Sequence, residues 1–336
     1  MDPVVWLNAM INGYRGTAVA GTAARLGLAD HLAGGCGSVA ELAAATGADP
    51  GGLRILVRAM TALGLVTDDG GRLRLTAFGN PLRSDHPSSL GQVAAYVSAA
   101  TAPAYDGLHE SLRVGGTAFE HRFGARFYDH LARNPGMAGD LNGMLSLPGL
   151  DTAVAEAVDL SHAATVVDVG GGNGAVLAEV LRRGPHLRGV VFDLPAVLAL
   201  GAAPLEDPML EGRWTAVGGD FLEEVPSGDC LIVARVLANW PDEAAERILR
   251  TCRRALGTGQ RLLVIEQALP ERVEAGDLLE LGSLDLFVNF GGRLRTEEEF
   301  RSIVVRAGLH LTGTTPLDVA GGRWAVLEAV PGEDVG

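Results

Sequence analysis

The stretch VVDVGGGNGAVLAEVLRR, residues 166–183, decides the fold of this chain. Its apolar start runs to Asp168, glycines follow at positions 170, 172 and 174, and the remaining residues have helical spacing. Glycines allow positive φ and a close approach of the backbone to a ligand, and the helix that follows presents unpaired N–H groups. We therefore expect a strand, a ligand-binding turn and a helix in this order.

Short apolar runs continue after this turn and alternate with amphipathic helical patterns. Counting the first strand, the runs are TVVDVG (165–170), GVVFDL (189–194), DCLIVARVL (229–237), RLLVIEQAL (261–269), LHLTGTTPL (309–317) and RWAVLEAV (323–330). Buried strands that alternate with helices are typical of a parallel sheet with helices on both faces. Residues 161–336 are therefore predicted to form a Rossmann-like α/β domain, with the last two strands as an antiparallel hairpin at one edge.

Residues 1–100 have the pattern of short helices followed by a β-hairpin. Residues 16–35 have helical spacing and end on a pair of glycines, and Ser38 with Glu41 forms a capping box for the next helix. The turn TGADPGG (46–52) precedes a further helix that we expect to start near Gly52, and GLVTDDGGRLRLTAFG (64–79) predicts the hairpin. Together these elements predict a winged helix.

The charge balance argues against nucleic acid as a partner. The formal net charge of −14 repels phosphate backbones. Residues 1–100 contain seven arginines and seven acidic residues, so their net charge is zero. A DNA-binding regulator would need a basic recognition helix. We therefore favour packing and dimerisation as the role of the winged helix and keep DNA binding as the weaker alternative.

No segment has the pattern of a signal peptide or a membrane-spanning helix. The chain opens with Asp2 and Pro3, without a basic region before an apolar run, and no apolar stretch reaches the roughly 18 residues that a spanning helix needs. The cysteines at 36, 230 and 252 have neither CxxC spacing nor nearby histidine pairs, which argues against disulfides and against a metal site. We expect a cytoplasmic protein that does not associate with membranes.

Three acidic residues near strand ends indicate which ligand the glycine turn binds. Asp168 precedes the first glycine, where a carboxylate attracts an ammonium or sulfonium group and repels a pyrophosphate. Asp193 ends the next strand and suits two ribose hydroxyls, and Asp220 in GGDF suits an adenine amino group. Dinucleotide sites use a similar glycine turn, and each Asp alone is better explained as a loop cap. The three acids together with the turn predict S-adenosylmethionine as the cofactor.

Four segments resemble the O-methyltransferase family that includes plant caffeic acid and bacterial antibiotic-pathway enzymes. They are VVDVGGGNGAVLAEVLRRGPHLRGVVFDLP (166–195), GGDF (218–221), VLANWPDEAAERILRTCRRAL (236–256) and GGRLRTEEEF (291–300). The resemblance implies a class I methyltransferase fold, a homodimer through the N-terminal winged helix, and a small-molecule pocket between the helical and α/β domains, to which the helical linker 101–160 contributes. The cofactor-binding residues that it implies are Asp168, Gly170, Gly172, Asp193, Leu194, Asp220, Phe221, Arg235 and Trp240.

The chain departs from this family at the residues that the resemblance links to proton transfer. The family motif Leu-His-Asp-Trp, whose histidine is the general base, is here Leu-Ala-Asn-Trp, so Ala238 stands at the base position with Asn239 beside it. A family glutamate that helps to orient that histidine is here Leu294, which leaves Glu266 as the other matching acid. The usual acid–base groups are thus missing, because alanine cannot accept a proton.

An intact cofactor motif without the usual base restricts the acceptor. Methyl transfer from a sulfonium has a good leaving group, so positioning supplies much of the rate, and an acceptor that is already ionised needs no base. Asp285 is a candidate base or anchor for a cationic substrate, with local pairing as the equal alternative. Tyr105, Met144 and Asn289 match pocket-lining positions, although simple packing also explains them.

We predict a methyltransferase that acts at oxygen on a small aromatic or polyketide-like secondary metabolite, with Glu266, Asn239 and Asp285 as candidate catalytic residues. The substitutions at Ala238 and Leu294 keep alternatives open. These are C-methylation, or a non-methylating reaction such as hydroxylation, decarboxylation or cyclisation in which the sulfonium serves as a fixed positive charge.

Overall fold

The computed structural model describes residues 2–134, 136–137, 139–141, 149–319 and 322–332. The chain forms two compact units, one of Met1–Leu112 with Phe119–Leu145 and one of Arg113–Ala118 with Ser146–Gly336. The sequence analysis divides the chain at residues 100 and 160 according to the expected roles of the regions. That division stays a prediction.

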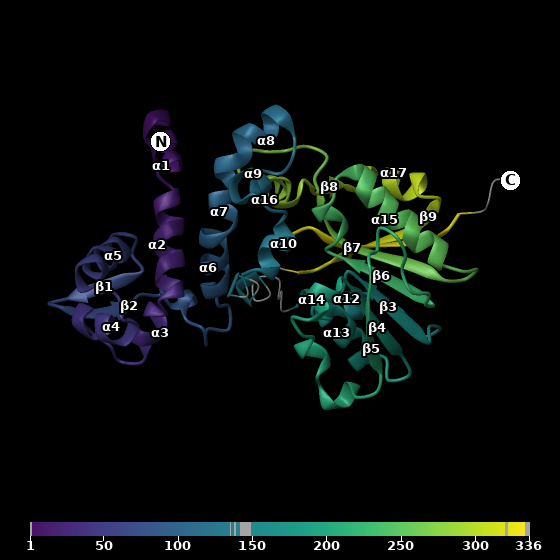
Figure 1. Cartoon of the computed structure of the whole chain (residues 1–336), viewed down its shortest axis with the longest axis horizontal. Helices are drawn as coiled ribbons and strands as arrows, with labels where there is room; N and C mark the ends of the chain where they lie inside the picture. Colours follow the sequence, from purple (N-terminus) through teal and green to yellow (C-terminus); the bar gives the residue numbers. More distant parts are fainter. Residues whose placement is uncertain (1, 135, 138, 142–148, 320–321, 333–336) are drawn as a thin grey trace. The chain divides into compact units, whose positions relative to one another are not determined.

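The N-terminal part of the chain is helical apart from one hairpin (Figure 1). It contains α1 (Pro3–Ile11), α2 (Tyr14–Arg25), α3 (Leu28–Ala33), α4 (Val39–Thr46), α5 (Pro50–Ala62), and the antiparallel hairpin of β1 (Val66–Asp69) and β2 (Arg72–Leu75). The 3-10 helix η1 (Asn80–Leu82), α6 (Gly91–Ala99), α7 (Thr101–Ala104), η2 (Tyr105–Gly107), α8 (Leu108–Val114), α9 (Ala118–Phe123) and α10 (Phe127–Ala132) follow. The succession of α4, α5 and the hairpin is that of a winged helix, as predicted.

Local signals in the sequence account for most of the helix boundaries in this unit. The Ser38 hydroxyl accepts the Glu41 N–H at 3.2 Å, as the predicted capping box requires. The Glu41 carboxylate accepts from the N–H of Gly37 at 2.7 Å, one residue earlier than a capping box has it. Both bonds satisfy donors that the start of α4 leaves open.

Two helix boundaries differ from the sequence prediction. Gly27, with φ of 60°, interrupts the helical run 16–35 and separates α2 from α3. The left-handed conformation at that glycine ends one helix and redirects the next. The second winged-helix helix begins at Pro50 and not at Gly52, because the Asp49 carboxylate caps it by accepting the Gly52 N–H at 2.6 Å.

The apolar helix α1 has no buried residue within the single chain. Its exposed large side chains are Val4, Val5, Trp6, Leu7, Met10 and Ile11. The rest of the winged-helix region packs around its own core, which includes Leu28, Leu42, Leu53, Val57 and Met60. In the described part of the chain, no helix is both long enough and apolar enough to cross a bilayer.

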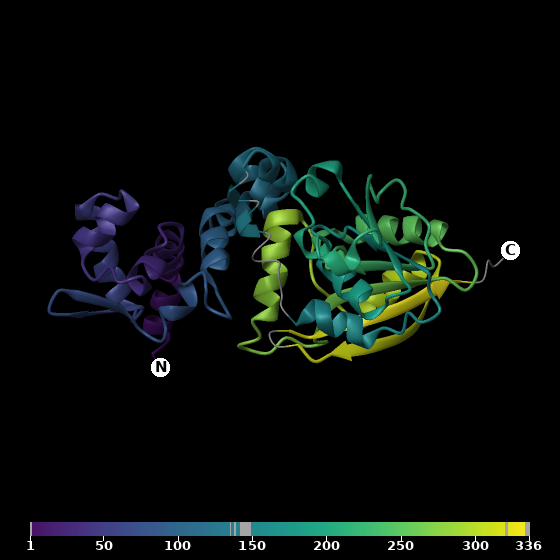
Figure 2. The same cartoon turned by 90° about the horizontal axis from the view of Figure 1, so that it is seen from below.

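The second unit is built around a mostly parallel sheet (Figure 2). Its strands are β3 (Thr165–Val169), β4 (Arg188–Asp193), β5 (Trp214–Gly218), β6 (Cys230–Ala234), β7 (Arg261–Leu269), β8 (Arg295–Thr296), β9 (Leu309–Leu317) and β10 (Trp324–Pro331). Its helices are α12 (Leu150–Ala157), α13 (Ala175–Arg183), α14 (Pro195–Leu198), η3 (Ala203–Leu205), η4 (Pro208–Leu210), η5 (Leu237–Asn239), α15 (Asp242–Ala255), α16 (Leu279–Phe290) and α17 (Glu297–Arg306). The strand order is β5-β4-β3-β6-β7-β10-β9, with β8 paired to β7. β10 is antiparallel to both β7 and β9, so the predicted edge hairpin is confirmed.

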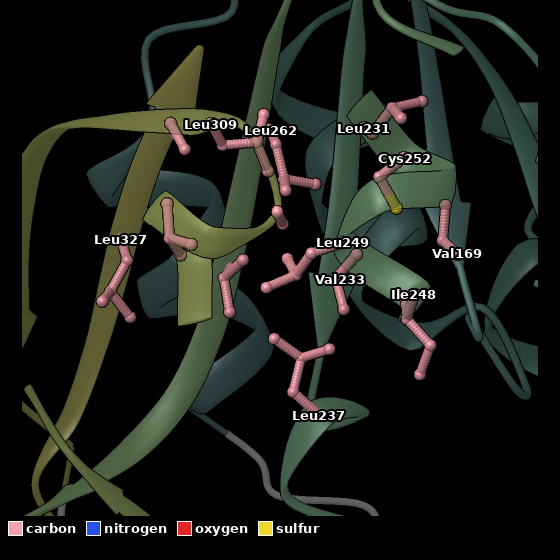
Figure 3. Close-up of a cluster of buried hydrophobic side chains, with 14 of the residues drawn as sticks. Val169, Leu231, Val233, Leu237, Ile248, Leu249, Cys252, Leu262, Leu309 and Leu327 are labelled. Atoms are coloured by element: carbon pink, nitrogen blue, oxygen red, sulfur yellow. The ribbon is translucent and has the colours of Figure 1, made fainter. Parts of the chain in front are cut away.

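Each face of the sheet is covered by helices, as the sequence pattern predicts. On one face, α15 packs on Val169, Leu231 and Val233 (Figure 3), and buried residues of α17 belong to the same core. On the other face, α12 and α13 pack on Val166 and Ile232. The central strands β3 and β6 and the first part of β7 are buried on both sides, which explains why their sequences are continuous apolar runs.

The strand order reverses between β3 and β6, which are neighbours although β4 and β5 lie between them in sequence. Open α/β sheets bind ligands at the carboxyl ends of strands beside such a reversal. The glycine turn follows β3 and Arg235 follows β6, so both lie at this position.

Candidate cofactor site and catalytic loop

The glycine turn after β3 lies directly over the carboxyl group of Asp168. A Cβ atom at Gly171 would lie 2.7 Å from the Asp168 Cγ, closer than any side chain tolerates. Gly170 and Gly172 have φ of 69° and 55°, in the left-handed region that glycine adopts at little cost. The sequence analysis selected Gly170 and Gly172 but missed Gly171, which the unbroken run of three glycines signals.

Asp168 is the most deeply placed acid of the turn, with 2% of its surface exposed. Among the described residues, its Oδ2 atom has no hydrogen-bond partner. Burial raises the pKa of its carboxyl to about 7, and the nearby Arg235 opposes this rise. A buried carboxylate oxygen without a donor is costly. A cationic donor from a ligand would remove that cost.

Asp193 at the end of β4 ties its own strand to the glycine turn. Its Oδ2 accepts the Gly172 N–H at 2.9 Å and its Oδ1 accepts the Leu194 N–H at 2.7 Å. Burial raises the pKa of this carboxyl, and the two backbone donors counteract the rise. The acid that the sequence assigns to the ribose is therefore held in a fixed orientation beside the turn.

Two aromatic side chains lie on the other side of the turn. The rings of Phe221 and Trp240 meet edge to face, with centroids 5.8 Å apart and an interplanar angle of 86°. The Phe221 ring also lies 3.4 Å from the position of a Cβ on Gly170. Asp220 is exposed, and its Oδ1 accepts the Leu222 N–H at 2.8 Å. The aromatic pair suits the flat face of an adenine.

Arg235 follows β6 in a conformation that is unusual for its residue type. It has φ of 61°, the single positive φ outside glycine among the described residues. Its Nη2 lies 3.5 Å from the Asp151 Oδ1. The sequence analysis missed Asp151, because it precedes the glycine turn by a whole helix and loop and belongs to no motif.

The loop 237–240 carries Ala238 and Asn239, where the sequence analysis expects a departure from the family motif. Ala238 and Leu294 are each 4% exposed and Glu266 is 2% exposed. The Glu266 Oε1 accepts the Ala238 N–H at 3.2 Å. Burial raises the pKa of Glu266 to about 7, while the backbone N–H of Ala238 and the charge of Arg295 oppose the rise.

A fully buried arginine holds this loop through its backbone carbonyl groups. Arg295 is 0% exposed, pairs with Asp242 at 2.8 Å, and donates to the carbonyl oxygens of Leu237 and Trp240 at 2.9 and 2.8 Å. Gly292 approaches the same loop so closely that a Cβ there would lie 2.1 Å from the Ala238 oxygen. Arg295 was not selected from the sequence, although it stands in the quoted segment 291–300.

The remaining predicted residues are placed as follows. Asp285 and Asn289 lie on α16, which packs against η5, and the Asn289 amide donates to the Asp285 carbonyl at 2.8 Å. The Asn239 amide donates to the Arg235 carbonyl at 3.4 Å. Tyr105 is half-buried in the first unit. Met144 lies outside the described residues.

Comparison with known proteins decides the family. The O-methyltransferase domain matches residues 105–310, and the O-methyltransferase dimerisation domain matches residues 8–85. The chain belongs to the O-methyltransferase family. Members of this family use S-adenosylmethionine, which agrees with the cofactor expected from the sequence. It also agrees with the buried Asp168 Oδ2 atom, which has no donor in the described part of the chain.

Relatives of this methyltransferase-family chain act in different ways. It is 35% identical to O-demethylpuromycin-O-methyltransferase of Streptomyces alboniger, over 96% of this chain and 88% of that one. It is 36% identical to aclacinomycin 10-hydroxylase RdmB of Streptomyces purpurascens, over 86% of this chain and 80% of that one. The solved structure of NcsB1 from neocarzinostatin biosynthesis, an O-methyltransferase in complex with S-adenosylmethionine and 2-hydroxy-5-methyl naphthoic acid, matches with a TM-score of 0.85 and 30% identity, over 94% of this chain and 96% of that one.

Proposed function

We propose that this chain transfers a methyl group from S-adenosylmethionine to an oxygen of a small aromatic or polyketide-like metabolite, without a side-chain base at position 238. The observation that supports the lack of a base at position 238 is the buried loop around Ala238. There the Glu266 carboxylate accepts the backbone N–H of Ala238. Leu294, at the other position where the sequence analysis expects a lost acid, is buried and cannot take a proton.

The residues around the glycine turn are proposed to bind and orient the cofactor. The bound cofactor supplies an electrophilic methyl group on a sulfonium that leaves readily. Asp168 provides a negative, buried oxygen for the ammonium end, and Asp193 provides a fixed carboxylate for the ribose. Phe221 and Trp240 provide an apolar wall for the adenine. Holding the reactants in place supplies much of the rate in such a displacement.

The lack of a base at position 238 restricts the acceptor to groups that are ionised near neutral pH. A general base contributes about 10²–10⁴-fold, so a phenol of ordinary acidity would react slowly here. Acidic phenols and carboxylates avoid this loss. The hydroxynaphthoic acid bound by the relative NcsB1 supports an aromatic acid as the acceptor class. Asp285 is our proposal for a group that contacts the acceptor.

A second candidate function is non-methylating chemistry at the same cofactor site. The similarity to a protein named as a 10-hydroxylase supports it. So do Ala238 at the position expected for the family's base and Leu294 at the position expected for the glutamate that orients that base. In that reaction the sulfonium would remain intact and act as a fixed charge. We rank it below methyl transfer because the chain belongs to a family named for O-methyl transfer.

We also propose that the chain forms a homodimer through its N-terminal region. The exposed apolar side chains of α1 and the match of residues 8–85 to the family's dimerisation domain support this. An apolar helix without an intramolecular partner is costly in water. Sedimentation should give twice the mass of one chain, and Trp6→Glu with Met10→Glu should shift it to the monomer.

The experiment that tests the function uses methyl-labelled cofactor and a series of hydroxylated aromatics of graded phenol pKa. We expect label in the product, with rates that rise as the phenol pKa falls towards neutral. Consumption of substrate without transfer of label would favour the second candidate. Label transfer at equal rates across the series would contradict the proposed absence of a base.

A further inference from the structure

Two acidic residues and one arginine gather where β3, β6 and α12 meet. The Arg235 guanidinium lies 3.5 Å from the Asp151 carboxylate, and the side chains are 21% and 13% exposed. Asp168 is within electrostatic reach of both, since the charge of Arg235 lowers its pKa and that of Asp151 raises it. Asp193 is the further charged group that acts on Asp168, and it also raises the pKa.

The backbone of Arg235 is held in its strained conformation from both sides. Its N–H donates to the Ile265 carbonyl at 2.9 Å, and its carbonyl accepts the Asn239 amide at 3.4 Å. A left-handed φ on a residue with a long side chain persists where its surroundings over-determine it, and such outliers gather at functional sites. This backbone conformation sets the direction in which the Arg235 side chain leaves the backbone towards α12.

In this arrangement of charges, one carboxyl group of the glycine turn has an oxygen without a hydrogen-bond donor. Asp168 Oδ2 is buried and lacks a hydrogen-bond donor among the described residues. An arginine so near would be expected to satisfy it, because an unpaired buried carboxylate is costly. Arg235 instead lies against Asp151.

We propose that Asp151 is a positioning residue for the cofactor, which holds the Arg235 guanidinium away from Asp168. Asp168 thereby keeps its buried oxygen available for the ammonium group of the cofactor's amino-acid end. This inference rests on the proposed cofactor site. It assigns to α12, which carries no family motif, a part in recognising that end of the ligand.

The test is the variant Asp151→Asn, with two ligands measured by calorimetry. S-adenosylhomocysteine carries the amino-acid end, and 5′-methylthioadenosine lacks it. When Arg235 turns to Asp168, S-adenosylhomocysteine should lose one charge-assisted hydrogen bond, a fall of about 10- to 100-fold in affinity. Binding of 5′-methylthioadenosine should change less than about threefold. Asp159→Asn, an exposed acid that caps the next turn, is the matched control and should change neither.

A double-mutant cycle separates this role from a structural one. With Arg235→Met in the background, Asp151→Asn should add less than about twofold, because the residue acts only through the arginine. An equal loss for both ligands, or additive losses in the cycle, would overturn the positioning role. Failure of the wild-type protein to bind S-adenosylhomocysteine would instead overturn the cofactor site itself. The two failures are therefore distinguishable.

Discussion

The glycine turn and the loop 237–240 each bury one carboxyl group, and the two groups differ in one respect. Asp168 and Glu266 are both 2% exposed, and burial raises the pKa of each to about 7. Glu266 accepts the N–H of Ala238, whereas Asp168 has an oxygen without a donor among the described residues. A perturbed pKa alone therefore does not separate a ligand-binding acid from a structural one.

The hydrogen bonds of the two carboxyl groups distinguish Asp168 from Glu266. Perturbed acids gather at functional sites, but structural networks also produce them. In this chain the acid with an open oxygen, Asp168, lies under the glycine turn, and Glu266 accepts a backbone N–H through its Oε1. We propose that Asp168 receives the ligand and that Glu266 holds the loop.

Filling the space over Asp168 should give the largest effect. In Gly171→Val, the new Cβ would lie 2.7 Å from the Asp168 Cγ. Overpacking of about 1–3 kcal/mol and the loss of a charged hydrogen bond together predict a fall of about a thousandfold in affinity for S-adenosylhomocysteine. Calorimetry measures it. Gly313→Ala on β9, where a Cβ meets nothing within 4 Å, is the control that should bind normally.

Removing the buried arginine that holds the loop 237–240 should mainly lower the free energy of unfolding. Arg295→Met leaves the carbonyls of Leu237 and Trp240 without this donor. Unsatisfied buried acceptors cost about 1–3 kcal/mol each, so we expect a loss of about 3 kcal/mol in the free energy of unfolding. Urea unfolding measures it. The control Arg301→Met removes a half-exposed pair with Glu297 and should cost under about 1 kcal/mol.

The sequence predicts the fold well because its signals are local. Glycine turns, apolar runs and capping residues such as Ser38 act within a few positions, and the strands and most helices follow from them. Asp151 and Arg295 could not be assigned in this way. Their roles depend on partners 84 and 58 positions away, which only the packing of the sheet brings together. The residue roles at the site remain proposals that these variants test.

The pH dependence of stability tests the open acid without a ligand. Because the pKa of Asp168 is raised from 3.8 to about 7, the folded state retains a proton that the unfolded state has lost. The free energy of unfolding therefore falls as pH rises between these values. Asp168→Asn lacks this dependence, so its stability relative to wild type should rise by about 2 kcal/mol from about pH 5 to about pH 6.5.

Asp159 provides a control without a slope for that measurement. The backbone N–H of Ser161 lowers its pKa below the ordinary 3.8, so Asp159 is deprotonated in both the folded and the unfolded state from about pH 5 upward. The stability of Asp159→Asn relative to wild type should therefore stay constant from about pH 5 to about pH 6.5. A flat difference for Asp168→Asn across the same window would show that its carboxyl is solvated in the folded protein, contrary to its burial.

The smallest expected effect on catalysis is at Glu266. In Glu266→Gln the amide oxygen still accepts the Ala238 N–H, so the loop should keep its geometry. If Glu266 were the base, its loss would lower kcat/KM by about 10²–10⁴-fold. Glu266 is 2% exposed and accepts the Ala238 N–H, so we assign it to holding the loop and not to taking the proton of the acceptor. We therefore expect kcat/KM to change less than about threefold, with an unchanged pH profile. A large fall confined to acceptors of high pKa would make Glu266 the base after all.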